Sequence, residues 1–304
     1  MSLNLELDTS LRIAHSLSLR GHHIYHCDTS RLAWTNSSKF AHTVANPVLF
    51  KGGPTLVELL KPAPNTLSFF DGIHMRKDPP FDIGYVASTW FLDAVSSQTK
   101  VLNRPEMLRN FNEKLGSFQF SEWMLPSCVS AHFEELIEFV KEIQTEFIII
   151  KPLDLFGGRG VQKLENKNHD ELKKIFNSLT ENGHIPIMVQ PFDSQVEKGE
   201  IRAFTAGGET INWCKKIPAK GEFLANTRAG ATLAPHEPTT QQQKAVTQIA
   251  QKLFSMGVFL TGIDLIGDHV SEINITSPRL LLAPEDPTNY YDKIAILVED
   301  YCKK

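Results

Sequence analysis

Residues 262–275 read Gly-Ile-Asp-Leu-Ile-Gly-Asp-His-Val-Ser-Glu-Ile-Asn-Ile, and this stretch decides the fold. Two apolar-rich segments, Val258–Ile266 and His269–Ile275, flank the turn residues Gly267-Asp268. Short apolar segments on either side of a glycine-containing two-residue turn predict a β-hairpin. We therefore expect the C-terminal part of the chain to contain an antiparallel sheet.

Three oxygen-bearing side chains lie within this hairpin. Glu272 and Asn274 are two residues apart, so they point to one face of their strand, and Asp264 can lie opposite them. Such groups are costly to bury unless they bind a cation or form hydrogen bonds. The set favours a site for a hard cation such as Mg²⁺, which nucleotide phosphates usually accompany. A solvated polar face of the hairpin is the alternative.

A glycine-rich turn further upstream is a candidate phosphate site. Residues 146–151 (Glu-Phe-Ile-Ile-Ile-Lys) predict a buried strand that ends in Lys151. Gly157-Gly158-Arg159-Gly160 follows and leads into a second strand, Val161–Leu164. Backbone N–H groups of a glycine turn can surround phosphate oxygens, and a buried lysine needs an anionic partner. A tight structural hairpin is the alternative.

A third candidate is the segment Met75–Asp82, which follows a predicted strand. Its sequence, Met-Arg-Lys-Asp-Pro-Pro-Phe-Asp, places two cations beside a stiff Pro-Pro corner. Ligands bind beyond the carboxyl ends of strands in α/β sheets, so Arg76 and Lys77 could hold an anionic substrate. A charged surface turn is the alternative.

Apolar runs alternate with helical patterns along most of the chain, which predicts an α/β fold. Two glycine motifs are missing: there is no G-x-x-x-x-G-K-[ST], and the glycine turn does not fit G-x-G-x-x-G. Residues 218–238 have little periodicity and predict a long loop. Strands are expected at 23–27, 67–75, 100–103, 186–190, 201–205 and 210–214, and helices at 81–97, 104–120, 169–180 and 239–256. A further helix is expected to start at Asp8-Thr9-Ser10, which offers an N-cap, and to stop at Gly21.

Composition excludes several function classes. The 304 residues carry 31 Lys+Arg and 35 Asp+Glu, so no global positive charge attracts nucleic acid or an anionic membrane. No apolar run is long enough to span a bilayer, and the first residues do not resemble a signal peptide. The four cysteines are far apart, as expected for free thiols in the cytoplasm. We therefore expect a cytoplasmic protein with small-molecule partners.

Taken together, these segments resemble the bacterial glutathione synthetase family, which consists of ATP-grasp carboxylate–amine ligases. The similarity runs from about Asp8 to the C-terminus, with the motifs in the family's order and spacing. The matching motifs are MRKDPPFD (75–82), NEKL (112–115), KPLD with two glycines (151–158), GIDLIGD (262–268) and EINITSP (272–278).

The resemblance implies a mixed α/β (α+β) fold with a doubly wound-like N-terminal domain and a two-lobed ATP-grasp domain. The implied boundaries are 1–118 for the N-terminal domain, 119–190 for the central lobe with the glycine-rich lid, and 191–304 for the C-terminal lobe with the metal site. The family's opening strand is missing from the first domain. A homodimer or homotetramer is also implied.

The resemblance also implies roles for individual residues. The family joins γ-glutamylcysteine to glycine through an acyl-phosphate, with ATP as co-substrate and Mg²⁺ (or Mn²⁺) as cofactor. Arg202 and Lys151 would be catalytic, and Asp264, Glu272 and Asn274 would hold the metal. The substrates would contact Arg76, Lys77, Asp78, Asn226 and Ser277. ATP would contact Lys114, Lys151, Gly157, Gly158, Gln190, Pro191, Phe192, Asp193, Glu200 and Asn274.

The chain departs from the family pattern mainly on the side of the acceptor substrate. The family prefers arginines near Leu224 and Thr232 and paired glycines at positions 230–231, where this chain has Gly-Ala. After Pro278 it also lacks the family's Arg-Glu segment. Two alternatives therefore stay open: a ligase with a different acid and amine, and a nucleotide-binding remnant without turnover.

Overall fold

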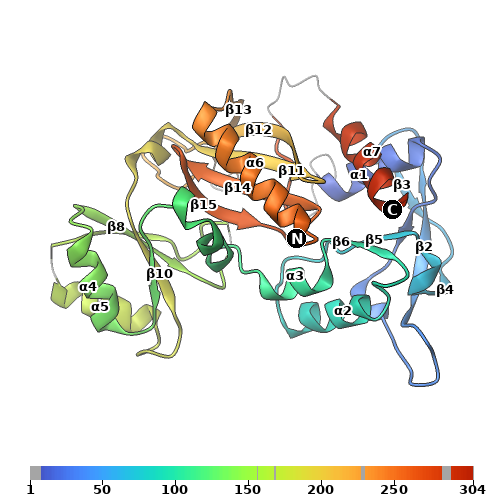
Figure 1. Ribbon diagram of the computed structural model, residues 1–304, viewed down its shortest axis with the longest axis horizontal. Coiled ribbons are helices and arrows are strands. Elements are labelled where there is room, and N and C mark those ends of the chain that lie inside the picture. The colour runs from blue at the N-terminus through green and yellow to red at the C-terminus, as the bar shows by residue number, and fades with distance from the viewer. Residues whose placement is uncertain (1–7, 156, 168, 227–229, 283–288, 304) are drawn as a thin grey trace.

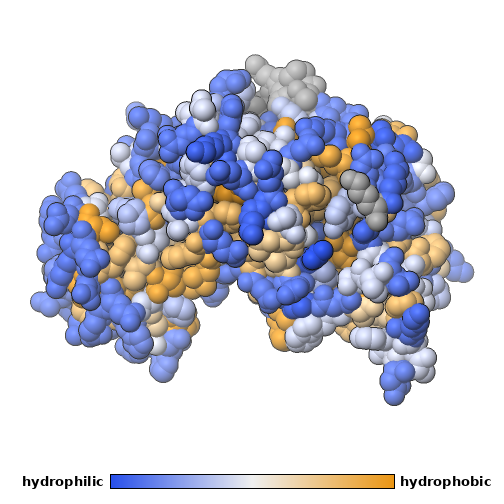
Figure 2. All heavy atoms as spheres, viewed as in Figure 1, coloured by the Kyte–Doolittle hydropathy of each residue, from blue (hydrophilic) through white to orange (hydrophobic). Residues whose placement is uncertain are grey.

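The computed structural model describes residues 8–155, 157–167, 169–226, 230–282 and 289–303. Three regions lie side by side: an N-terminal region, a central lobe around β8 and β10, and a C-terminal sheet between them (Figure 1). The face in Figure 2 is hollowed along its lower edge, between the central lobe and the N-terminal region. No helix in the described ranges is long and apolar enough to cross a membrane.

The N-terminal region combines helices with two small sheets. Its first helix starts where expected, because the Asp8 side chain accepts a hydrogen bond from the Leu11 N–H at 2.8 Å. The long strand β2 pairs antiparallel with three partners, and among the residues of this region that the structure describes only β5 and β6 pair in parallel. The elements are α1 (Thr9–Leu19), β1 (Tyr25–His26), β2 (His42–Phe50), β3 (Val57–Leu59), β4 (Ala63–Thr66), β5 (Gly72–His74) and β6 (Lys100–Leu102).

This arrangement corrects part of the sequence prediction. The mixed helix-and-sheet fold is confirmed. The antiparallel strands β2–β4 had no predicted counterpart, and only two parallel strands are present among the described residues of the N-terminal region. The strand expected at 67–75 consists of a short 3₁₀ helix, Leu67–Phe69, and then β5. Leu67 and Met75, at the two ends of this stretch, are buried, whereas Phe69 between them is exposed, so the apolar run does not correspond to one continuous strand.

Two helices of this region are shorter than predicted. The helix expected at 81–97 is α2 (Ile83–Asp93), which Asp82 caps by accepting from the Tyr85 N–H at 2.8 Å. The helix expected at 104–120 is divided into α3 (Pro105–Asn110) and a 3₁₀ helix, Leu115–Trp123. Asn112 lies in the break, where its Oδ1 accepts from the Lys114 N–H at 3.0 Å. Such side-chain-to-backbone bonds compete with continuation of a helix.

The central lobe is a four-stranded sheet with two helices packed on it. Its strand order is β7-β10-β8-β9, and all neighbouring strands are antiparallel. Leu136, Phe176 and Ile150 are fully buried in the core between helices and sheet. The elements are β7 (Cys128–Ser130), α4 (Phe133–Glu142), β8 (Phe147–Pro152), β9 (Gln162–Glu165), α5 (His169–Leu179) and β10 (Ile187–Pro191).

The C-terminal sheet has five antiparallel strands in the order β13-β12-β11-β14-β15. The expected hairpin is confirmed as β14 and β15, in which Asp264 pairs directly with Glu272. The predicted loop 218–238 also contains β13, which pairs with β12. The elements are β11 (Glu200–Ala206), β12 (Glu209–Ile217), β13 (Thr232–Pro235), α6 (Thr240–Ser255), β14 (Leu260–Ile266), β15 (His269–Asn274) and α7 (Tyr290–Lys303).

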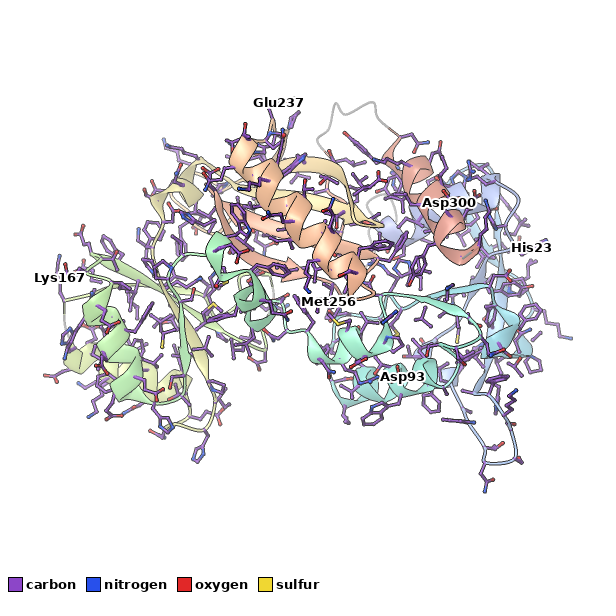
Figure 3. All side chains as sticks on the ribbon, in the orientation of Figure 1. His23, Asp93, Lys167, Glu237, Met256 and Asp300 are labelled. Carbon is purple, nitrogen blue, oxygen red and sulfur yellow. The ribbon has the colours of Figure 1, made fainter. Side chains whose placement is uncertain are left out.

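Asn103 joins the N-terminal region to the C-terminal sheet. Its Oδ1 accepts from the N–H groups of Phe259 and Leu260 at 2.7 and 2.8 Å. Its Nδ2 donates to the carbonyls of Leu260 and Ile275 at 2.8 and 2.5 Å. The side chain is 2% exposed, so these four bonds form away from water. Met256, which is labelled at the end of α6 in Figure 3, lies three residues before Phe259 in the chain.

Candidate functional site

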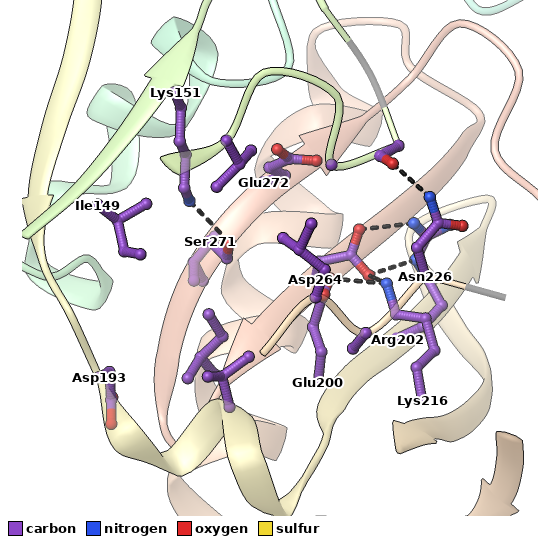
Figure 4. A pocket seen from close by; sticks show the side chains of 18 of the residues that line it. Ile149, Lys151, Asp193, Glu200, Arg202, Lys216, Asn226, Asp264, Ser271 and Glu272 are labelled. Atoms are coloured by element: carbon purple, nitrogen blue, oxygen red, sulfur yellow. Dashed lines mark hydrogen bonds and ion pairs between the residues drawn. The ribbon is translucent and has the colours of Figure 1, made fainter. Parts of the chain in front are cut away.

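A cavity of about 290 Å³ lies between the central lobe and the C-terminal sheet. Its walls come from β8 and β10 on one side and β11, β12, β14 and β15 on the other (Figure 4). Alternation along the strands explains why polar groups face it: Ile263 and Leu265 are in the core under α6, and Asp264 between them points the opposite way. The predicted residues that line the cavity are Lys151, Gly157, Gly158, Gln190, Pro191, Phe192, Asp193, Glu200, Arg202, Asn226, Asp264, Glu272, Asn274 and Ser277.

Asp264 lies at the centre of the charged wall and is almost fully buried. Arg202 contacts it through two bonds, Nε to Oδ1 at 2.7 Å and Nη2 to Oδ2 at 2.5 Å. The Lys216 Nζ lies 3.0 Å from Oδ1. Burial alone would raise the pKa of Asp264, but the two cations outweigh it and hold the pKa well below its usual range. Asp264 is therefore ionised at neutral pH.

Lys216 is a site residue that the sequence analysis missed. Its Nζ also lies 2.6 Å from Glu200 Oε1, and Glu200 is its directly paired residue on β11. Burial and the charge of Asp264 raise the pKa of Glu200 to about 7, against the opposing effect of Lys216. The strand was expected to end at Cys214. Extending it by two residues would have placed Lys216 on the same face as Cys214.

The three predicted metal ligands do meet on one face of the sheet. Asp264 and Glu272 are directly paired, and the Asn274 Nδ2 donates to Asp264 Oδ2 at 3.1 Å. No group of three or more His, Cys, Asp or Glu that could hold a metal ion exists among the described residues. Two carboxylates and an amide oxygen suit a hard cation, but such an ion would need further oxygen ligands from phosphate or water.

The two predicted lysines occupy different places. Lys151 lines the cavity and its Nζ lies 3.2 Å from Ser271 Oγ; burial lowers its pKa, while the charge of Glu272 opposes this. Lys114 is not in the cavity wall. Its Nζ donates to Glu113 Oε1 at 2.6 Å and to the Leu155 carbonyl at 2.7 Å, and lies 3.7 Å from Glu272. Lys114 thus lies outside the cavity wall, where its positive charge stabilises the Glu272 carboxylate.

Glu113 is the second residue that the sequence analysis missed. Burial and the nearby charge of Glu272 raise its pKa to about 7, although Lys114 opposes this. Its backbone carbonyl accepts from the Ile273 N–H at 2.9 Å, which joins the break after α3 to β15. The NEKL motif gave the position, but nothing in the sequence indicated its burial.

The segment Arg76–Asp78 lies outside the cavity wall. Arg76 donates to Ser10 Oγ at 3.0 Å and to the Pro278 carbonyl at 2.8 Å, and Asp78 accepts from the Thr276 hydroxyl. Lys77 is exposed. The segment therefore holds the chain around Ser277, which does line the cavity.

The glycine turn forms part of the cavity wall on the side of the central lobe. Gly157, Gly158 and Gly160 all have φ between +66° and +77°, a conformation that other residues rarely adopt. Asn226, from the chain after β12, donates to the Gly157 carbonyl (Figure 4). The glycine turn of the central lobe and the chain after β12 are thus in direct contact at the cavity.

Comparison with known proteins agrees with this geometry. Residues 1–109 match the family model of the prokaryotic glutathione synthetase N-terminal domain, and residues 113–284 match that of its ATP-grasp domain. The chain is 32% identical over 293 residues to a glutathione synthetase of Nitrosomonas europaea, covering 94% of this chain and 90% of the relative. It is 34% identical over 274 residues to that of Ralstonia nicotianae, covering 89% and 83%.

Solved structures show the same fold. The ATP-grasp ligase PsnB, complexed with a phosphomimetic variant of a minimal precursor, Mg and ADP, matches with a TM-score of 0.64 over 96% of this chain and 94% of its own. The D-cycloserine synthetase DcsG matches with a TM-score of 0.59 over 77% and 85%. Each is 16% identical to this chain, which supports a shared fold alone. The matches to family models and relatives go further: the chain belongs to the prokaryotic glutathione synthetase family and is an ATP-dependent carboxylate–amine ligase of that type.

Proposed function

We propose that this chain joins γ-glutamylcysteine to glycine and cleaves ATP to ADP and phosphate. The observation that carries the proposal is the buried array of Arg202, Asp264 and Lys216, which faces Lys151 across one cavity. A carboxylate is a poor electrophile until it is phosphorylated. Phosphoryl transfer needs in-line positioning and cations against the developing charge, and Lys151, Arg202 and Lys216 supply such cations at this cavity.

The proposed roles follow from the walls of the cavity. Backbone groups of Gln190–Asp193 would bind adenine, and Lys151 would neutralise phosphate oxygens. Arg202, held by two bonds to Asp264, would stabilise the γ-phosphate and the acyl-phosphate. Asp264, Glu272 and Asn274 would hold Mg²⁺, whose charge would neutralise phosphate oxygens when bound.

The proposed reaction has two steps. A carboxylate oxygen of γ-glutamylcysteine attacks the γ-phosphorus, and ADP leaves. The amine of glycine then attacks the acyl carbon, phosphate leaves, and the amine gives up a proton. The contact between the glycine turn and Asn226 would limit access of water to a bound acyl-phosphate and so reduce its hydrolysis.

One assay tests the proposal. ADP release is measured with Mg²⁺ and ATP, adding γ-glutamylcysteine, glycine, both or neither. Release only with both substrates supports the proposal. Release with another acid–amine pair supports a related ligase, which the departures at Leu224 and Thr232 favour as the second candidate. Nucleotide binding without release under any pair would refute ligase activity.

We further propose a cytoplasmic location and a homodimeric or homotetrameric state. None of the four cysteines, all of which lie among the described residues, forms a disulfide, as is usual for proteins of a reducing compartment where ATP is also available. Light scattering of the purified protein tests the oligomeric state.

A further inference from the structure

After β12, the chain passes along the cavity wall between the proposed adenine hinge and the glycine turn. After β12 it turns sharply, with the Glu222 N–H donating to the Ala219 carbonyl at 2.9 Å and Gly221 at φ +87°. Residues 223–226, which we name the crossing segment, then line the cavity. Two of its side chains, Phe223 and Leu224, are large and apolar.

Phe223 contacts the proposed adenine hinge. Its ring lies 6.3 Å from the ring of Phe192, at an interplanar angle of 84°. This edge-to-face geometry is the favourable one for aromatic pairs. Both residues line the cavity. The crossing segment therefore touches the residue beside which adenine would bind.

Phe192 is itself held firmly from the other side. Its N–H donates to the Phe147 carbonyl at 2.9 Å, and the two rings lie 6.4 Å apart. The Lys163 Nζ lies 3.5 Å from the centre of the Phe192 ring, a cation–π contact from β9. These contacts hold Phe192 in place against the central lobe, whereas its partner Phe223 comes from the chain that follows β12 of the C-terminal sheet.

The next residues of the crossing segment contact the glycine turn. A Cβ atom on Gly158 would lie 3.5 Å from Leu224 Cδ2, so Leu224 packs directly on that glycine. Asn226 donates to the Gly157 carbonyl. One short segment therefore contacts both the adenine end and the phosphate end of the proposed nucleotide site.

We propose that Phe223 is a positioning residue that links nucleotide binding to the placement of the crossing segment, and so to the acceptor side of the cavity. The inference rests on the proposed function, because it takes Phe192 as part of the adenine hinge. Adenine bound beside Phe192 extends the apolar surface on which Phe223 packs, and so favours the seated position of Phe223. By reciprocity, a seated Phe223 strengthens nucleotide binding by the same factor.

Hydrogen exchange tests the link directly. Amides 222–226 of the full chain are followed with and without the ATP analogue AMPPNP and Mg²⁺. In the wild type, AMPPNP should slow their exchange; in Phe223→Ala this protection should be largely lost, and in Phe223→Leu or Phe223→Tyr it should be retained. The control is Phe69→Ala, which removes a similar edge contact with Tyr25 (5.7 Å, 88°) far from the cavity.

Binding and kinetics supply the second test. Loss of one aromatic pair should weaken AMPPNP binding to Phe223→Ala by roughly two- to tenfold. The KM for ATP should rise by a similar factor, with a smaller change in kcat. Equal protection and equal affinity in the wild type and Phe223→Ala would overturn the inference. Failure of the wild type to bind AMPPNP would instead refute the proposed function, so the two failures are distinguishable.

Discussion

Glu200 and Lys216 face each other as directly paired residues of β11 and β12, and the Lys216 ammonium lies 2.6 Å from the Glu200 carboxylate. The same ammonium lies 3.0 Å from Asp264, so one buried lysine neutralises two carboxylates. The charged wall of the cavity thus depends on a residue that none of the recognised motifs contains.

Lys216→Met should destabilise the protein by about 3 kcal/mol, because it leaves the buried Glu200 without its cation and Asp264 with Arg202 alone. Urea unfolding at pH 8, where Glu200 is ionised, measures the effect. Lys216→Arg should retain most of the stability. Lys215→Met is the matched control, since this neighbour points to the opposite face of β12 and should change stability little. Equal losses at positions 215 and 216 would contradict the assignment.

Glu200 predicts a specific pH dependence of stability. Its pKa rises from 4.5 to about 7 on folding, so the folded protein binds the proton more tightly than the unfolded chain. Its contribution to stability is therefore complete below about pH 4.5 and is lost as the pH rises through 7. The free energy of unfolding should fall in this window, with a slope of about 1 kcal/mol per pH unit from this group.

The comparison of Glu200→Gln with the wild type isolates that contribution. The variant carries a neutral amide at every pH, so its unfolding free energy should vary less between pH 5 and 8. Asp264 has the opposite sign: its lowered pKa adds stability above its usual pKa, and this is lost only in strong acid. Parallel pH profiles for wild type and variant would show that Glu200 titrates normally.

Glu272→Gln should lower turnover by roughly 100-fold or more while the protein stays folded, because it removes one charge from the proposed metal site. ADP release with saturating substrates measures activity, and circular dichroism checks the fold. The control Glu197→Gln alters an exposed carboxylate outside the cavity wall. Near-normal turnover in Glu272→Gln would refute the metal assignment.

Asn103→Gly should destabilise the protein by roughly 2–4 kcal/mol, because four buried backbone groups lose their partner. Asn103 has φ +57°, which glycine accepts and alanine does not. Asn103→Ala should therefore cost about 1 kcal/mol more than Asn103→Gly. Thermal and urea unfolding compare the two, and an equal effect would mean that backbone strain contributes nothing.

The sequence was most informative where polar residues interrupt apolar strands. The apolar segments on either side of Gly267-Asp268 predicted the hairpin, and the two-residue period of a strand predicted the face that Asp264, Glu272 and Asn274 share.

What the sequence could not supply depends on contacts between distant segments. Lys216 and Glu113 acquire their importance from burial beside carboxylates on other strands. The strands β2–β4 contain prolines, short runs and exposed apolar residues such as Leu49 and Leu59, which hide the usual alternation. Helix α3 ends where Phe111 leaves the helical conformation, and no glycine or proline at this point of the sequence predicts that end.

The clamp that Asn103 forms bears on how this enzyme can be dissected. A truncated protein that began at residue 113 would keep the whole charged wall, yet it would lose both donors to the carbonyls of Leu260 and Ile275. It would also lose Arg76, which holds the chain at Pro278. We therefore expect the matched ATP-grasp segment to be less stable alone than in the full chain, so attempts to minimise or recombine this ligase should keep the first 110 residues attached.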